Sequence, residues 1–195
     1  MIWKNKFILI VLAAVMVMDV KAGDQGGGPE DFLRIFFTKL TKVGEIRNLK
    51  EKESKFVAVV NRNIDLDWIA NFILGRHQKN ITKDQRKQFI DLYSKYLASS
   101  YRAALSIYKS DNYELISTEK QKEHVFMIST FVLLDGKKVR NVFRIVEKNG
   151  KYHITDIVVE GISFIAAKRA DLNSMIMSKG FNDFLEELRA RNDRD

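Results

Sequence analysis

Through the first half of the chain, apolar residues recur every three or four positions, which is the period of a helix with one buried face. Pro29 stands where the first position of a helix is expected, and the apolar stripe behind it ends at Gly44. Residues 50–61 have the same period. Asp65 is a candidate N-cap for a third helix, which Gly75 is placed to end. This pattern predicts three successive helices.

A longer helix and a sheet are predicted next. Thr82 and Gln85 match the capping-box pattern, which marks the start of the longest helix. From Tyr113 the chain is rich in Val, Ile and Phe with short polar breaks, which is typical of strands. Four strands are predicted, over residues 113–117, 125–134, 139–147 and 152–159. Asp135–Gly136 and Asn149–Gly150 are strong tight-turn pairs, so the last three strands should form an antiparallel meander.

The stretch 156–173 marks the return from strands to helices. It begins as an apolar strand, bends at Gly161 and continues with the period of a helix over Ile162–Met177. A break at Lys179–Gly180 separates this helix from a last short one. Helices, then strands, then helices predict an α+β fold with helices packed on a mainly antiparallel four-stranded sheet.

The N-terminal residues differ in kind from the rest. Lys4 and Lys6 precede the uninterrupted apolar run Phe7–Met18, which is shorter than the ~20 residues needed to cross a bilayer as a helix. Val20 and Ala22 are small residues at the two positions that precede a cleavage site. We therefore expect a secretory signal peptide, cleaved after Ala22; an N-terminal anchor that stays attached is the alternative.

The mature chain is expected to be one basic domain. Residues 23–28 form a glycine-rich lead expected to be flexible, and residues 29–195 have the length and composition of a single globular domain. The chain has no Cys, which excludes thiol chemistry and leaves stability to packing alone. Loss of residues 1–22 lowers the formal net charge from +8 to +6. In an exported protein this favours anionic membrane surfaces or acidic protein faces as partners, and nucleic acid is not expected.

Catalytic chemistry has little support in the sequence. His77, His124 and His153 are far apart and lack metal-site spacing such as H-E-x-x-H, so neither a metal site nor a catalytic residue is predicted. Asp156 and Glu160 lie four residues apart, and paired carboxylates can perform acid–base catalysis. A structural role is favoured, because Glu160 immediately precedes the bend and the expected helix start, where an acid is stabilising.

Several stretches resemble one known family. They are D-L-D-W-I-A-N-F-I-L-G-R-H (Asp65–His77), T-K-D-Q-R-K-Q-F (Thr82–Phe89), D-I-V-V-E-G-I-S-F (Asp156–Phe164) and K-R-A-D-L-N-S-M-I (Lys168–Ile176), followed by Gly180 and a short helix. Their order and spacing resemble the MlaC, or toluene-tolerance, family of exported phospholipid-binding proteins over nearly the whole mature chain. Two departures, Gln78 where an aromatic is common and Asn63–Ile64 where a proline is common, leave the lipid specificity open.

The resemblance implies a non-catalytic periplasmic carrier in a Gram-negative cell. Such a carrier holds a glycerophospholipid by its acyl chains in an apolar cavity between helices and a curved sheet, with no other cofactor. It moves lipid between an outer-membrane lipoprotein–porin complex and an inner-membrane ABC transporter that has an MCE-domain subunit, which maintains the lipid asymmetry of the outer membrane.

Candidate residues for the lipid cavity follow from the resemblance together with the apolar pattern. The expected lining is Ile69, Phe72, Ile73, Phe89, Leu92, Tyr96, Phe126, Ile128, Val142, Ile157, Ile162, Ile165, Leu172 and Ile176. Arg76, Lys168 and Arg169 are candidates to meet the headgroup at the mouth. For each apolar position ordinary core is the alternative, because periodicity identifies a buried face without identifying what covers it. Two other functions stay open at this point, a small α+β enzyme with a pocket and a periplasmic adaptor that binds only proteins.

Overall fold

The structure of the chain, a computed structural model, describes residues 27–105, 113–134 and 136–194. Its helices are α1 (Pro29–Gly44), α2 (Leu49–Asn63), α3 (Leu66–Leu74), α4 (Lys83–Leu105), α5 (Phe164–Lys179) and α6 (Phe181–Arg194), with a 3-10 turn η1 (Gly75–Asn80). Its strands are β1 (Tyr113–Lys122), β2 (Val125–Leu134), β3 (Lys137–Lys148), β4 (Lys151–Val159) and β5 (Ile162–Ser163). The predicted α+β order is confirmed.

Local capping signals place the helix starts as predicted. The Asp65 side chain accepts a hydrogen bond from the Trp68 backbone N–H at 3.0 Å and begins α3. Thr82 and Gln85 form the reciprocal capping box at the start of α4, with bonds of 2.8 and 3.1 Å. Gly75 ends α3 with a φ of 47°, a conformation that favours glycine.

The sheet has the order β1-β2-β3-β4-β5, and every neighbouring pair is antiparallel. The predicted turn between β3 and β4 is present, since Asn149 and Gly150 have φ values of 54° and 70°, as a two-residue type I′ turn requires. The other predicted turn includes Asp135, which lies outside the described residues.

The sequence prediction was wrong about where the last long helix begins. Ile162 does not start that helix but pairs with Val159 as part of the short fifth strand. The helix begins at Phe164, because the Ser163 hydroxyl accepts a hydrogen bond from the Ala166 backbone N–H at 3.1 Å and acts as its N-cap. The apolar period predicted the helix start two residues too early, because Ile162 fits the helical spacing in the sequence although it lies on β5 and is exposed.

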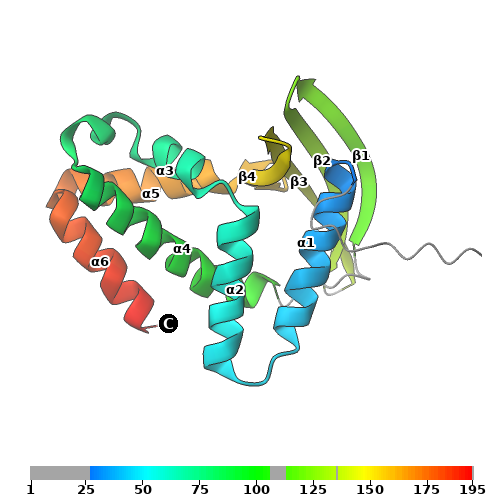
Figure 1. The fold of residues 1–195 in the computed structure, drawn as a ribbon, viewed down its shortest axis with the longest axis horizontal. Helices are drawn as coiled ribbons and strands as arrows, with labels where there is room; N and C mark the ends of the chain where they lie inside the picture. Colours follow the sequence, from blue (N-terminus) through cyan, green and yellow to red (C-terminus); the bar gives the residue numbers. More distant parts are fainter. Residues whose placement is uncertain (1–26, 106–112, 135, 195) are drawn as a thin grey trace, which may run out of the picture.

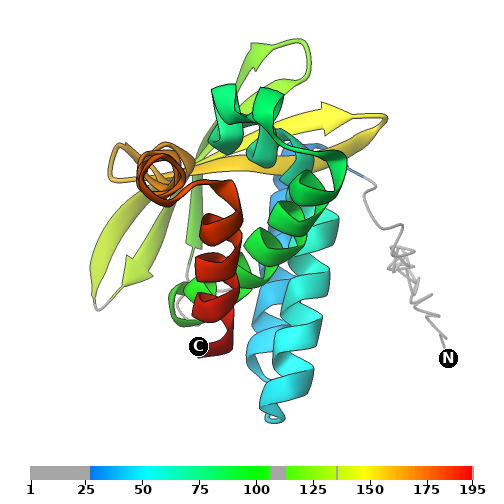
Figure 2. The ribbon, with the colours of Figure 1, turned by 90° about the vertical axis from the view of Figure 1, so that its left-hand side faces the viewer.

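The helices form two groups around the sheet. Helix α1 lies against one face of the sheet, and β1 and β2 curve past it (Figure 1). Phe37 of α1 packs edge-on against Phe143 of β3, with 5.4 Å between ring centroids, and against Tyr113 of β1 at 4.5 Å. Helices α3 to α6 form a second group beyond the β4 edge, in which α4 and α6 lie side by side (Figure 2). Helix α2 contacts both α1 and α4 and so joins the two groups.

The N-terminal 26 residues, which include the predicted signal peptide, lie outside the described part of the chain. Among the described helices, none combines the length and the apolar composition needed to cross a membrane.

Candidate functional site

A small apolar cavity lies where the two helix groups meet the sheet. Its walls come from the α2–α3 linker, α3, α4, β4 and α5: Ile64, Ile69, Tyr93, Leu97, Ile154, Thr155, Asp156, Ile157, Phe164 and Ile165. Its volume is ≈ 30 Å³, which is close to the share of one water molecule in the liquid. Pockets for organic ligands usually measure about 300–1,000 Å³, so this apolar cavity is too small to hold such a ligand without movement of its walls.

Three of the predicted lining residues, Ile69, Ile157 and Ile165, line the apolar cavity. Eight others pack in the surrounding core as buried or half-buried side chains: Phe72, Ile73, Phe89, Leu92, Tyr96, Phe126, Leu172 and Ile176. Ile128 is fully buried and lies opposite Phe143 of β3, on the sheet face that α1 covers. Val142 alternates with the buried Phe143 along β3, which places it on the opposite face of that strand. Ile162 is 68% exposed on β5. Contact between these residues and a lipid stays a prediction.

Sequence reasoning missed several walls of the apolar cavity. Tyr93 and Leu97 are buried one helical turn apart on α4, and neither was among the residues predicted to line the cavity. Ile64 carried no periodic signal because it lies in the linker between two helices, where it forms a β-bridge with Ile154. Burial raises the pKa of the Tyr93 hydroxyl above its ordinary value, so the Tyr93 side chain stays uncharged.

Asp156 is the charged group in the wall of the apolar cavity, and its carboxylate is fully engaged. It accepts hydrogen bonds from its neighbour's backbone N–H (Ile157, 2.8 Å), from the Ser163 hydroxyl (2.6 Å) and from the Ile165 backbone N–H (3.2 Å). These bonds tie β4 to the N-terminal turn of α5. Glu160, with a φ of 48°, accepts a bond from the Arg140 backbone N–H at 2.6 Å. The two carboxylates therefore hold the bend, as their position in the sequence indicated.

The three basic residues predicted to lie at the mouth of the lipid cavity are found in two different places in the structure. Arg76 and Arg169 line a shallow surface pocket of ≈ 470 Å³ against α5. Arg169 lies over the Phe72 ring, 4.9 Å from its centroid. Lys168 lies elsewhere and donates a hydrogen bond to the Tyr96 hydroxyl at 2.8 Å. A headgroup role for the three together stays a prediction, because they do not share one pocket.

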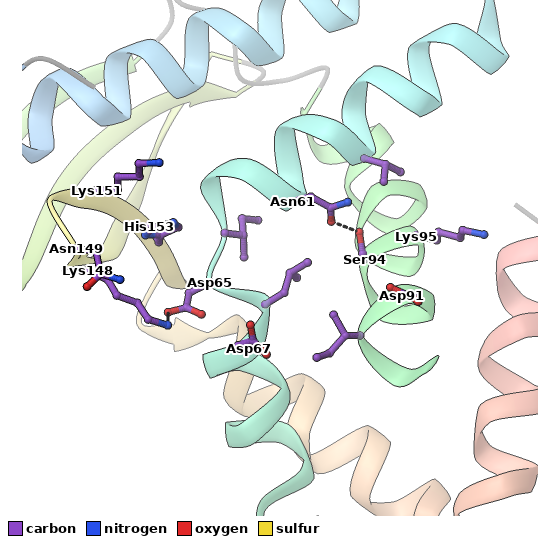
Figure 3. A pocket seen from close by; sticks show the side chains of 14 residues that line it. Asn61, Asp65, Asp67, Asp91, Ser94, Lys95, Lys148, Asn149, Lys151 and His153 are labelled. Atoms are coloured by element: carbon purple, nitrogen blue, oxygen red, sulfur yellow. Dashed lines mark hydrogen bonds and ion pairs between the residues drawn. The ribbon is translucent and has the colours of Figure 1, made fainter. Parts of the chain in front are cut away.

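A larger groove, which we call the polar groove, opens on the other side of the α2–α3 linker (Figure 3). Its volume is ≈ 860 Å³. Four half-buried aliphatic residues line it, namely Val57, Ile64, Leu66 and Ile90, and its polar lining is Asn61, Asp65, Asp67, Asp91, Ser94, Lys95, Lys148, Asn149, Lys151 and His153. Ile64 also lines the apolar cavity, so the linker forms a wall between the two spaces. No sequence pattern predicted the polar groove, because its residues come from α2, α3, α4 and the β3–β4 hairpin.

No cluster of three His, Cys, Asp or Glu side chains that could hold a metal occurs in the described part of the chain. His153 lines the polar groove and Asp156 the apolar cavity, so the two residues do not share one pocket. His124 lies near Glu147 at an exposed edge, 3.4 Å apart. These placements bring together no nucleophile, base and orienting group.

Two threonines of the sheet offer a matched stability prediction. Thr130 and Thr155 are both 0% exposed. The Thr155 hydroxyl donates to the Arg144 backbone carbonyl at 3.3 Å, whereas the Thr130 hydroxyl, opposite the buried Asn141, has no hydrogen-bond partner among the described residues. Thr130→Val should raise the free energy of unfolding by about 1 kcal/mol, and Thr155→Val should lower it by about 1 kcal/mol, because an unpaired buried hydroxyl costs free energy and a paired one contributes it. Urea unfolding of both variants measures this, and a lower stability of Thr130→Val would contradict it.

Comparison with known proteins connects these features to a family. The sequence model described as MlaC protein matches residues 36–190, which is most of the chain. A solved structure of a phospholipid-binding protein from Ralstonia solanacearum, in complex with a phospholipid, has a TM-score of 0.73 and 15% sequence identity, and the match covers 86% of this chain and 98% of that one. At this identity the likeness is one of fold.

Proposed function

Because the chain belongs to the MlaC family, we propose that it is a periplasmic carrier that binds one glycerophospholipid by its acyl chains in the apolar cavity. The family consists of lipid carriers and not of enzymes, which excludes the small-enzyme alternative. The observation that carries the proposal is the apolar cavity at the junction of α3, α4, α5 and the sheet, in a chain with the fold of a protein solved with bound phospholipid.

The energetics of an apolar cavity suit a carrier. Each methylene group removed from water contributes about 0.8 kcal/mol, so two acyl chains are held tightly once they are inside. The cavity of ≈ 30 Å³ cannot admit them without movement of its walls. A partner that opens the walls or competes for the lipid then controls both loading and release.

The family also supplies the proposed route. We assign to this chain transfer between an outer-membrane lipoprotein–porin complex and an inner-membrane ABC transporter with an MCE-domain subunit, which maintains outer-membrane lipid asymmetry. This role needs export, and residues 1–22 have the composition of a cleaved signal peptide. N-terminal sequencing of protein recovered from the periplasm should begin at Gly23.

Extraction of bound lipid tests the proposal. Protein purified under native conditions from membrane-containing cells and extracted with organic solvent should release about one phospholipid per chain, identified by mass spectrometry. A periplasmic adaptor that binds only proteins should release none. A lipid-free preparation would therefore exclude the carrier function and favour the adaptor.

A further inference from the structure

The acidic residues of the polar groove already have cationic partners. Asp65 accepts bonds from both the Trp68 backbone N–H and Lys148, the latter at 3.3 Å. Arg86 pairs with Asp67 at 2.9 Å, and Lys87 pairs with Asp91 at 2.8 Å. The carboxylates are thus neutralised by side chains, and they leave no surplus of negative charge to attract a cation.

Unmatched donors lie at the β3–β4 hairpin end of the polar groove. Lys151 and His153 lie together on β4, on the side of the groove opposite Ser94 of α4 (Figure 3). Lys151 is exposed at the start of β4, and its ammonium group forms no ion pair with any described Asp or Glu. His153 lines the polar groove as well, and among the described residues its ring forms no hydrogen bond. Its Nδ1 atom is buried, so a ligand in the groove meets the imidazole from the Nε2 side.

The aliphatic lining adds a second requirement for the ligand. Ile64 and Leu66 lie in the polar groove next to its charged residues, and Ile64 separates it from the apolar cavity. A ligand that satisfies both parts carries an anionic group at one end and apolar chain at the other. An ammonium and an imidazole form the charge-assisted hydrogen bonds that bind phosphate oxygens strongly.

We propose that the hairpin end of the polar groove binds the phosphate group of an amphiphile, with Lys151 and His153 as its donors and Ile64 and Leu66 against the adjoining apolar part. This proposal rests on the proposed carrier function. It places the phosphate of the carried lipid in the polar groove and its acyl chains in the apolar cavity, on the other side of the α2–α3 linker. It assigns headgroup contact to residues other than Arg76, Lys168 and Arg169. Inorganic phosphate offers the same chemistry without the apolar part.

Titration calorimetry on the delipidated mature chain, with three probes, distinguishes the phosphate group of an amphiphile from inorganic phosphate as the ligand. The probes are monomeric dihexanoyl phosphatidylglycerol, monohexanoyl glycerol, which lacks phosphate, and inorganic phosphate. The variants are Lys151→Gln and His153→Phe. Lys137→Gln is the matched control, an exposed lysine at the opposite end of β3.

Lys151→Gln and His153→Phe should each weaken binding of the short phospholipid about tenfold, the effect of losing one charge-assisted contact. Their affinity for monohexanoyl glycerol should stay unchanged, and Lys137→Gln should change neither. Unchanged phospholipid binding in both variants, or an equal loss for both amphiphiles, would overturn the phosphate site. Inorganic phosphate that binds as tightly as the phospholipid would overturn the amphiphile assignment. Failure of the unmodified chain to bind either amphiphile would instead contradict the carrier function.

Discussion

Asp156→Ala should lower the free energy of unfolding by about 3 kcal/mol, because it removes an acceptor of three hydrogen bonds and strands their donors in a half-buried site. The carboxylate holds the Ser163 hydroxyl, which itself caps α5, and it also binds the Ile165 backbone N–H. Ser163→Ala should cost only about 1 kcal/mol, the usual loss for an N-cap, because Asp156 still binds Ile165. Denaturant unfolding followed by circular dichroism measures both losses.

Asp171→Ala is the control for this prediction, since Asp171 is an exposed acid on the same helix. Exposed substitutions away from caps and ion pairs usually change stability by less than about 0.5 kcal/mol. The prediction fails if Asp156→Ala is as stable as Asp171→Ala. That result would mean that packing of Ile165 and Leu172, and not the carboxylate, fixes the start of α5.

Much of the fold could be predicted from the sequence because its signals are local. The Thr82–Gln85 capping box, the Asp65 cap and the Asn149–Gly150 turn each depend on residues within a few positions of one another, and each is present in the structure. The error at Ile162 has a tertiary cause. Its place in β5 is set by pairing with Val159, which the helical period of the following residues obscured.

The site was less predictable because no single segment contains it. Ile69, Ile157 and Ile165 were expected to line a cavity, and they come together from α3, β4 and α5. Phe89 and Leu172 have equally strong apolar patterns and pack in the surrounding core. Periodicity reports which face is buried and cannot distinguish a neighbour from a ligand.

Access to the apolar cavity can be traced to the α2–α3 linker. Ile64 of the linker lines both the apolar cavity and the polar groove, and the linker is joined to β4 through the Ile64–Ile154 bridge, in which the Asp65 backbone N–H donates to the Ile154 carbonyl at 3.0 Å. Separation of the linker from the β3–β4 hairpin breaks this bridge and the 3.3 Å contact between Lys148 and Asp65, and it joins the two spaces. A lipid whose headgroup lies in the polar groove and whose chains fill the cavity requires this opening.

A disulfide that fixes the linker to β4 should abolish lipid uptake, which makes the double variant Ile64→Cys with Ile154→Cys the sharpest test of this route. Bridged strands lie about 4.8 Å apart, within the Cα separation of roughly 4.4–6.8 Å that a disulfide spans, and the chain has no other Cys. The variant is delipidated, oxidised and incubated with phospholipid vesicles, and the lipid bound per chain is measured by mass spectrometry. The oxidised form should acquire at least about tenfold less lipid than the same protein after reduction, because opening of the linker is blocked in one form and free in the other.

The reduced form is the matched control, since both forms lack the same two isoleucine side chains. Equal uptake by the two forms would show that lipid enters elsewhere, and movement of α5 away from β4 would then be the route to test.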